Sequence, residues 1–211
     1  MDREMQADSE PFDLTAGALC LDFANTLGDR PRSTQEHLGG YEDLLRFGRE
    51  AEILPPADLD ELDGLSKEHP RKARTAFKRA IEIRETLYRI FSGLACNGEP
   101  RAEDIQVLNS ELRRALRQLE VRAQDGAFDW VWAGPVDAFD RPLWPVIRSA
   151  AELLASADVG SIRECASETC SWLFVDRSRT RRRRWCDMST CGNRAKARRH
   201  YQRRKRTRAS G

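Results

Sequence analysis

Residues 165–170 read CASETC and residues 186–191 read CDMSTC, so two cysteine pairs of the same spacing are separated by 15 residues. Each pair is short enough to form one knuckle, and the loop between them is long enough to fold back. Four thiolates brought together in this way can be the tetrahedral ligands of a structural zinc ion. The stretch therefore predicts one Zn²⁺ ion held by Cys165, Cys170, Cys186 and Cys191.

Three other uses of these four cysteines are open alternatives. An iron–sulfur cluster also takes four cysteines, but its usual spacings differ from this pattern. Two disulfides are disfavoured in a reducing compartment. A catalytic zinc ion needs a coordination position for water, and four thiolates leave none. A structural zinc site is therefore the preferred interpretation.

The remaining composition is that of a soluble globular protein. The 211 residues are 40% hydrophobic and 33% charged. No apolar run approaches the ~20 residues of a membrane span, and residues 1–10 lack the basic and then apolar pattern of a signal peptide. We therefore expect a cytoplasmic protein with no membrane contact.

The two parts of the chain differ sharply in charge. Residues 161–211 contain 16 Lys and Arg but only 4 Asp and Glu, whereas residues 1–160 contain 20 and 30. A basic end on an acidic body predicts a polyanionic partner for that end. The alternative is a solvated, disordered tail. Because the basic run follows directly from the cysteine knuckle, we favour a nucleic-acid partner.

Hydrophobic periodicity divides the chain into a start, a body and a finger. Residues 1–15 are predicted to be disordered, and residues 16–160 to form a helical domain with apolar residues at three- and four-residue steps. The period changes near residues 119–133, where Asp125-Gly126 predicts a β-hairpin. Its tryptophans are interpreted as core residues in preference to the wall of a ligand pocket. Residues 161–211 complete a fold that is mainly α with a small β-hairpin (α+β), ending in a treble-clef-like four-cysteine zinc finger and a basic helix.

The finger is predicted to present a basic surface. Residues 172–176 are expected to form a strand, residues 177–184 a basic turn and return strand, and residues 193–208 a helix that could follow a groove of duplex nucleic acid. The predicted contacts are Arg181, Arg182, Arg183, Arg184, Asn193, Arg194, Lys196, Arg198, Arg199, Arg203 and Arg204. Among them, Asn193, Arg194 and Arg198 are candidates for contacts with base edges, and contacts with phosphates alone are an equal alternative.

In the body, Arg84 falls in the middle of the apolar stripe of a helix expected from about residue 70 to 95. A buried guanidinium needs an acidic partner, a cluster of backbone carbonyl groups or an anionic ligand. An internal salt bridge, for example with Asp22, is the preferred interpretation. The alternative is a ligand pocket formed by Asp22, Asn25 and Arg84. Because no catalytic constellation or Gly-rich phosphate loop accompanies these residues, we do not expect an enzyme.

Several of these stretches resemble a known family. Residues 165–178, 184–188 and 191–196, with Cys191-Gly192-Asn193-Arg194 among them, closely resemble the CGNR zinc finger. Residues 21–26, LDFANT, resemble the N-terminal signature of the ABATE domain of stress-induced bacterial transcription regulators, with Ala24 where Val is expected. The resemblance covers nearly the whole chain after the first ten residues. It implies zinc-dependent DNA binding by the finger and a regulatory or sensing role for the body.

We therefore expect a DNA-binding transcription regulator whose body senses a small-molecule effector or forms a homodimer. An RNA-binding zinc module is the alternative with the same chemistry. The alternatives from other classes are an uncharacterised enzyme, or an interaction domain, tethered to nucleic acid by the finger.

Overall fold

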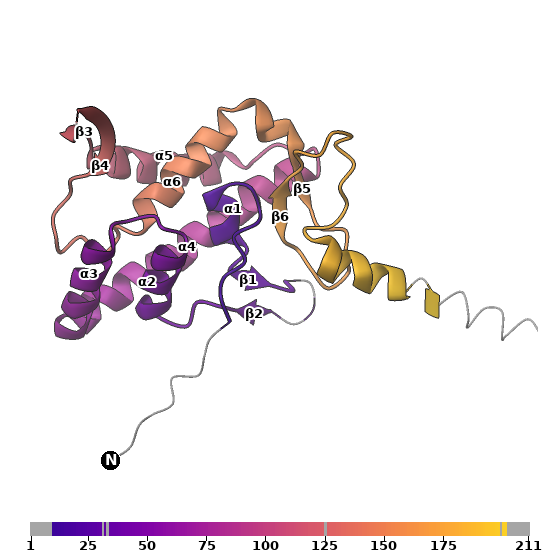
Figure 1. Ribbon diagram of the computed structural model, residues 1–211, viewed down its shortest axis with the longest axis horizontal. Helices are drawn as coiled ribbons and strands as arrows, with labels where there is room; N and C mark the ends of the chain where they lie inside the picture. Colours follow the sequence, from indigo (N-terminus) through magenta and orange to yellow (C-terminus); the bar gives the residue numbers. More distant parts are fainter. Residues whose placement is uncertain (1–9, 31, 33, 125, 199, 202–211) are drawn as a thin grey trace, which may run out of the picture.

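The computed structural model describes residues 10–30, 32, 34–124, 126–198 and 200–201 (Figure 1). The labelled helices in this part of the chain are α1 (Leu19–Ala24), α2 (Tyr41–Glu50), α3 (Pro56–Glu68), α4 (Pro70–Ala95), α5 (Ala102–Leu116) and α6 (Leu143–Leu154). Its antiparallel strand pairs are β1 (Leu27–Gly28) with β2 (Gln35–Glu36), β3 (Leu119–Gln124) with β4 (Ala127–Trp132), and β5 (Ile162–Glu164) with β6 (Leu173–Val175). A 3₁₀ turn, η1 (Ala157–Ser161), and a π turn, η2 (Met188–Gly192), complete the labelled elements. The fold is mainly helical with small β elements, as predicted.

The longest helix, α4, is the centre of the body. It packs against α1, α2, α3 and α5, and also against β5 and β6 (Figure 1). Ala80, Ile83 and Leu87 lie on its buried face at helical spacing, which explains why the helix is held in the core. The helix ends where Asn97 takes a left-handed conformation (φ 58°) and the N–H of Gly98 donates to the carbonyl oxygen of Gly93 (2.9 Å).

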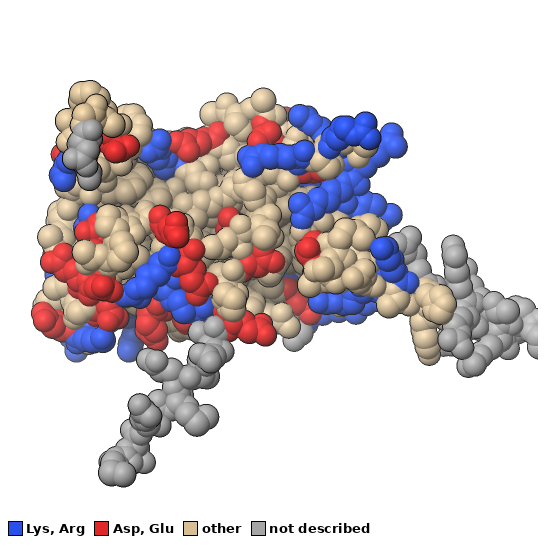
Figure 2. Space-filling model, viewed as in Figure 1, with Lys and Arg blue, Asp and Glu red and all other residues tan. Residues whose placement is uncertain are grey.

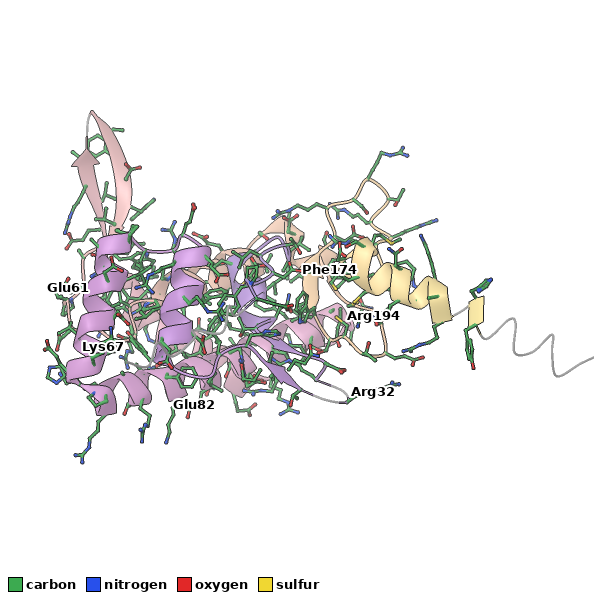
Figure 3. All side chains as sticks on the ribbon, turned by 60° about the horizontal axis from the view of Figure 1, so that its bottom comes forward. Arg32, Glu61, Lys67, Glu82, Phe174 and Arg194 are labelled. Atoms are coloured by element: carbon green, nitrogen blue, oxygen red, sulfur yellow. The ribbon has the colours of Figure 1, made fainter. Side chains whose placement is uncertain are left out.

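The predicted β-hairpin is present as β3 and β4. Leu119 pairs with Trp132 at one end, and Gly126, in the turn, has a φ of 82° that suits glycine. The hairpin projects from the helical body (Figure 3). The expectation that its tryptophans lie in the core is wrong for Trp130, which is 61% exposed. A two-stranded sheet has no second layer to cover both of its faces.

Residues 10–15, which the sequence assigns to a disordered start, lie against α2. The ring of Phe12 packs on that of Phe47, with centroids 5.3 Å apart, and its backbone N–H donates to Glu50 (2.7 Å). The guanidinium of Arg46 also stacks on the Phe12 ring, at 4.1 Å. The predicted disorder therefore does not hold for these residues, and residues 1–9 lie outside the described part of the chain.

The finger and the body share one hydrophobic core. Ile162, Leu173 and Phe174 are almost completely buried and belong to the same apolar cluster as the body residues Phe23 and Phe91. Figure 3 shows Phe174 where β6 meets the helices. The division of the chain near residue 160 stays a prediction, and the apolar contacts described here cross it.

Candidate metal centre and basic surface

The four cysteines of the finger converge on one point. Their sulfur atoms all lie within 4.8 Å of one another, and the residues are only 4 to 9% exposed. The sulfur of Cys186 is 3.7 Å from that of Cys170 and 3.7 Å from that of Cys191. Tetrahedral zinc with Zn–S bonds of about 2.3 Å holds its sulfurs about 3.8 Å apart. The cluster therefore has the donor set and the spacing of a structural Zn²⁺ site.

The same distances argue against the disulfide alternative. Sulfur atoms in a disulfide are about 2.05 Å apart, and all four cysteines here are free. Hydrogen bonds among the thiols lower the pKa of Cys165 and raise those of Cys170 and Cys186. A thiolate in this cluster is the form that binds a metal ion.

The first cysteine pair lies in the turn between β5 and β6. The N–H of Cys165 donates to the carbonyl oxygen of Trp172 (2.9 Å), and the N–H of Cys170 to that of Ser167 (3.1 Å). These bonds close a knuckle that carries both sulfurs inward. Because β5 and β6 are paired, and Ile162 and all of β6 are buried, the knuckle is fixed to the core of the protein.

The second pair lies at the start of the finger helix. Asp187 caps η2: its carboxylate accepts from the N–H of Thr190 (2.8 Å) and from the hydroxyl of Ser189 (2.5 Å). These hydrogen bonds lower the pKa of Asp187 to about 2. A Cβ atom at Gly192 would lie 2.5 Å from the sulfur of Met188, so a larger residue after Cys191 would force the Met188 side chain to move. Residues 193–198 then continue as an α-helix.

The loop of residues 177–184 differs from the prediction, because it contains no return strand. Instead, the buried carboxylate of Asp176 accepts hydrogen bonds from the N–H groups of Ser178 (3.0 Å) and Arg183 (2.8 Å) and closes the loop. Burial raises the pKa of Asp176, but these hydrogen bonds outweigh it and lower the pKa overall. β6 pairs instead with β5, the strand that precedes it in the sequence. The predicted return strand is therefore absent, and the side chain of Asp176 holds the loop closed.

The structure places the predicted basic residues of the loop in two ways. Arg181, Arg182 and Arg184 are exposed. Arg183 is half-buried, stacks on Phe174 at 4.5 Å, and donates from Nε to the carbonyl oxygen of Trp185 (2.8 Å). Arg183 is therefore partly committed to holding the loop, and the other three face solvent.

The helix after the cysteines carries a second set of basic residues. Asn193, Arg194 and Lys196 are not buried, and Figure 3 shows Arg194 at the end of the molecule that the finger forms. The side-chain amide of Asn193 donates to the carbonyl oxygen of Ser189 (3.0 Å), which fixes its orientation. Arg199, Arg203 and Arg204, also predicted to contact nucleic acid, lie outside the described residues.

One acidic residue of this surface was missed by sequence reasoning. Glu168, in the first knuckle, forms ion pairs with Arg198 of the helix and with Arg32 (3.1 Å) of the body. It is separated from Arg198 by 30 residues, so no local pattern could have indicated the contact. Together, Arg184, Arg194 and Arg198 line a small cavity of 190 Å³ beside Glu168.

The predicted pocket of the body is only partly assembled. Asp22 and Asn25 line a cavity of 180 Å³ with Trp172 of the finger, but Arg84 does not line it. Burial raises the pKa of Asp22 to about 6, although a hydrogen bond from the N–H of Ala16 (2.9 Å) opposes the shift.

Arg84 is held inside the fold by protein acids. It is 2% exposed, and its two terminal nitrogens donate to both carboxylate oxygens of Glu36 (2.6 and 2.7 Å). Its Nε donates to Glu85 (3.0 Å), and Thr26 accepts a further bond (3.3 Å). The internal salt bridge preferred from the sequence is present, with Glu36 and Glu85 as partners in place of Asp22.

Asn25, one of the signature residues LDFANT (residues 21–26), connects the body to the finger. The side chain of Asn25, 5% exposed, accepts a hydrogen bond from the N–H of Leu173 (2.8 Å) and donates to its carbonyl oxygen (2.9 Å). An amide side chain has one donor and one acceptor group in the right positions to make both bonds at once. Asn25 thus makes the same two kinds of hydrogen bond with β6 that the backbone of a paired strand would make.

Among the described residues, no helix has the length and apolar character needed to cross a membrane. The geometry defines a class of protein: a helical domain joined through a shared core to a four-cysteine zinc finger with a cationic outer surface.

Comparison with known families agrees with this class. Residues 17–157 match the ABATE family, described as "Putative stress-induced transcription regulator", and residues 161–204 match the CGNR zinc finger. The chain therefore belongs to the ABATE family and carries a CGNR zinc finger. A comparison with curated proteins gives no match.

Proposed function

We propose that this protein is a DNA-binding transcription regulator whose zinc finger contacts the DNA. The observation that supports this most directly is the cationic surface at the finger end, where Lys and Arg gather in Figure 2. Its members include Arg177, Arg179, Arg181, Arg182, Arg184, Arg194 and Lys196. A surface of this kind attracts the phosphate backbone and releases its counterions on binding.

The acidic residues of the finger leave this surface largely uncompensated. Asp176 and Asp187 are engaged in the hydrogen bonds that close the loop and cap η2. Glu164 accepts hydrogen bonds from Ser92 (2.7 Å) and Tyr88 (3.3 Å) of α4. Beside the exposed arginines, Glu168 pairs with Arg198, and Asp158 of η1 pairs with Arg177 (3.0 Å). Because residues 161–211 contain 16 Lys and Arg but only 4 Asp and Glu, the finger keeps a strong excess of positive charge.

Zinc has a structural part in this proposal. The ion, bound by four thiolates, would fix the knuckle, the basic loop and the start of the helix relative to one another. Contacts with DNA depend on such fixed positions, because phosphate contacts set the orientation of a protein on the duplex. The described residues of the finger thus supply the contacts, and the metal ion keeps them in place.

A salt titration of DNA binding tests the proposal. Affinity for a labelled duplex is measured by fluorescence anisotropy between about 50 and 200 mM salt, where six or more phosphate contacts predict a loss of roughly 10³-fold or more. Arg194→Gln is expected to weaken binding and reduce the log–log salt slope by about 1. The matched control is Arg113→Gln on α5, an exposed arginine far from the finger in sequence, which should change neither.

Affinity that hardly changes with salt, or equal effects of the two substitutions, would refute the proposal. Tighter binding to double-stranded RNA than to DNA in the same assay would favour the RNA-binding alternative. We also propose that the protein acts in the cytoplasm, where reduced thiols are available for zinc. The helical body, in this proposal, responds to an effector or forms a homodimer.

A further inference from the structure

A cavity of 860 Å³ lies between the projecting hairpin and the connection from α2 to α3. These elements are at the end of the body opposite the finger (Figures 1 and 3). Typical small-molecule sites have volumes of roughly 300–1,000 Å³ and combine apolar walls with a few polar groups. The size and position of the cavity are therefore those of a ligand site separate from the basic surface.

The polar part of the cavity is dominated by arginine. Arg49, Arg122 and Arg141 line it, against the two acids Glu52 and Asp58. Arg49 and Arg122 also contact acids outside the lining, but these ion pairs are exposed and weak. A carboxylate entering the cavity can replace them with bidentate contacts, which arginine makes especially well.

Arg141 is the strongest single indication of an anionic ligand. The residue is 8% exposed, and one terminal nitrogen donates to Asp58 (2.7 Å) and to the carbonyl oxygen of Trp132 (3.0 Å). Its Nε is buried and has no hydrogen-bond partner within the described part of the chain. A buried donor without an acceptor is unfavourable. A ligand oxygen, reached by a small movement of the guanidinium, would supply that acceptor.

The apolar part of the cavity is suited to a flat ring. Trp132 lines it and is supported by Trp144, with ring centroids 5.9 Å apart. Trp130 also lines it and is 61% exposed, although Arg148 stacks on its ring at 5.3 Å. An exposed tryptophan on a short hairpin contributes little to a core and offers a stacking surface to a planar molecule.

We propose that this cavity binds a small aromatic carboxylate. The carboxylate pairs with Arg49 and Arg141, and the aromatic ring packs against Trp130 and Trp132, which lie on one face of the hairpin. Binding itself is independent of the function proposed above. The further statement that this molecule is the effector of the regulator rests on that function.

Isothermal titration calorimetry of the zinc-loaded full chain tests the proposal. The probe is 1-naphthoate, and the neutral isostere 1-naphthamide is its matched control. The carboxylate is expected to bind at least about tenfold more tightly than the amide, because the amide loses the charge-assisted hydrogen bonds. No binding of 1-naphthoate at about 10 mM, or equal binding of the amide, would overturn the proposal.

Two pairs of variants locate the site. Trp130→Ala is expected to weaken 1-naphthoate binding about tenfold or more, whereas Phe128→Ala, two residues earlier on the same strand and outside the cavity lining, leaves it within about twofold. Arg49→Gln is expected to weaken it about tenfold, and Arg113→Gln on α5 to have no effect. Circular dichroism confirms that each variant is folded. Equal effects within either pair contradict the assignment.

Sedimentation velocity tests the alternative that the exposed aromatic residues of the hairpin form a dimer interface. A dimer that both Trp130→Ala and Phe128→Ala convert to monomer, in a protein that binds no 1-naphthoate, would assign the hairpin to self-association and overturn the ligand site. Because neither calorimetry nor sedimentation involves DNA, a failure of the ligand-site proposal in these experiments would leave the DNA-binding proposal intact. Loss of DNA binding alone would, in turn, leave the ligand site intact.

Discussion

Replacing Asn25 with Ala is expected to destabilise the finger and the body together. The side chain of Asn25 exchanges two hydrogen bonds with the backbone of Leu173 (2.8 and 2.9 Å), across 148 residues of sequence. Leu173 is completely buried, so water cannot easily replace the lost partner. Alanine would leave one N–H and one carbonyl group of β6 unsatisfied.

The size of the effect follows from those two groups. An unsatisfied buried backbone group costs about 1–3 kcal/mol, and two of them give roughly 2–6 kcal/mol. Partial relaxation brings the expected loss of unfolding free energy to about 3 kcal/mol. In a chain of this size, 1 kcal/mol shifts the Tm by about 2–4 °C, so the variant should melt roughly 6–12 °C below the parent protein.

The assay follows both parts of the molecule in the same urea titration. Far-ultraviolet circular dichroism reports the helices of the body, and zinc release to a colorimetric chelator reports the finger. Both midpoints should fall in the Asn25→Ala variant. The control is Asn109→Ala, on the exposed side of α5, which should change stability by no more than about 0.5 kcal/mol.

Two results would refute this reasoning. Equal stabilities of Asn25→Ala and Asn109→Ala would show that the side chain of Asn25 does not stabilise β6. Earlier zinc release with an unchanged helical transition would show that finger and body unfold independently, despite the shared core.

Three further changes test other parts of the structure. Glu168→Gln frees Arg198 from its ion pair. The variant is expected to bind DNA more tightly and to steepen the log–log salt slope by about 1. Unchanged or weaker binding would contradict this. Asp22, with a pKa raised to about 6 by burial, binds its proton more tightly in the folded than in the unfolded protein, so stability should fall as pH rises from about 4 to about 6. Asp22→Asn should remove that decline and be about 3 kcal/mol more stable than the parent at about pH 7 in urea titrations. If stability depends on pH in the same way in both proteins, Asp22 is not the cause of the decline. Removal of zinc by chelation, or Cys186→Ser, should abolish DNA binding and lower the Tm, and DNA affinity that survives metal loss would rule out the structural part given to the ion.

The features that could be predicted from the sequence are those encoded by local spacing. The two cysteine pairs specify a knuckle and a helix start because each pair must fit one turn. Asp125-Gly126 indicates a hairpin because the turn needs a residue with positive φ, and Gly126 has one. The apolar stripe of α4 places Arg84 in the core because a helix repeats every 3.6 residues.

The features that could not be predicted depend on contacts between distant residues. Glu36, the main partner of Arg84, lies in a two-residue strand with no periodic pattern, 48 residues away. The exposure of Trp130 depends on which helices cover the hairpin, and the alternating pattern of β4 does not contain that information. The cavity beside Trp130 likewise forms only when the α2–α3 connection is placed opposite the hairpin.

The signature LDFANT illustrates why a short motif can be recognised before its purpose is understood. Its polar residues are buried, which is unfavourable unless each has a partner. Asp22 accepts from the N–H of Ala16, Asn25 pairs with Leu173, and Thr26 accepts from Arg84. The first bond is local, the second reaches the finger, and the third reaches the centre of α4. The motif therefore joins three parts of the fold at one place, and a substitution there changes how the finger is held on the body even though no residue of the motif binds the metal ion.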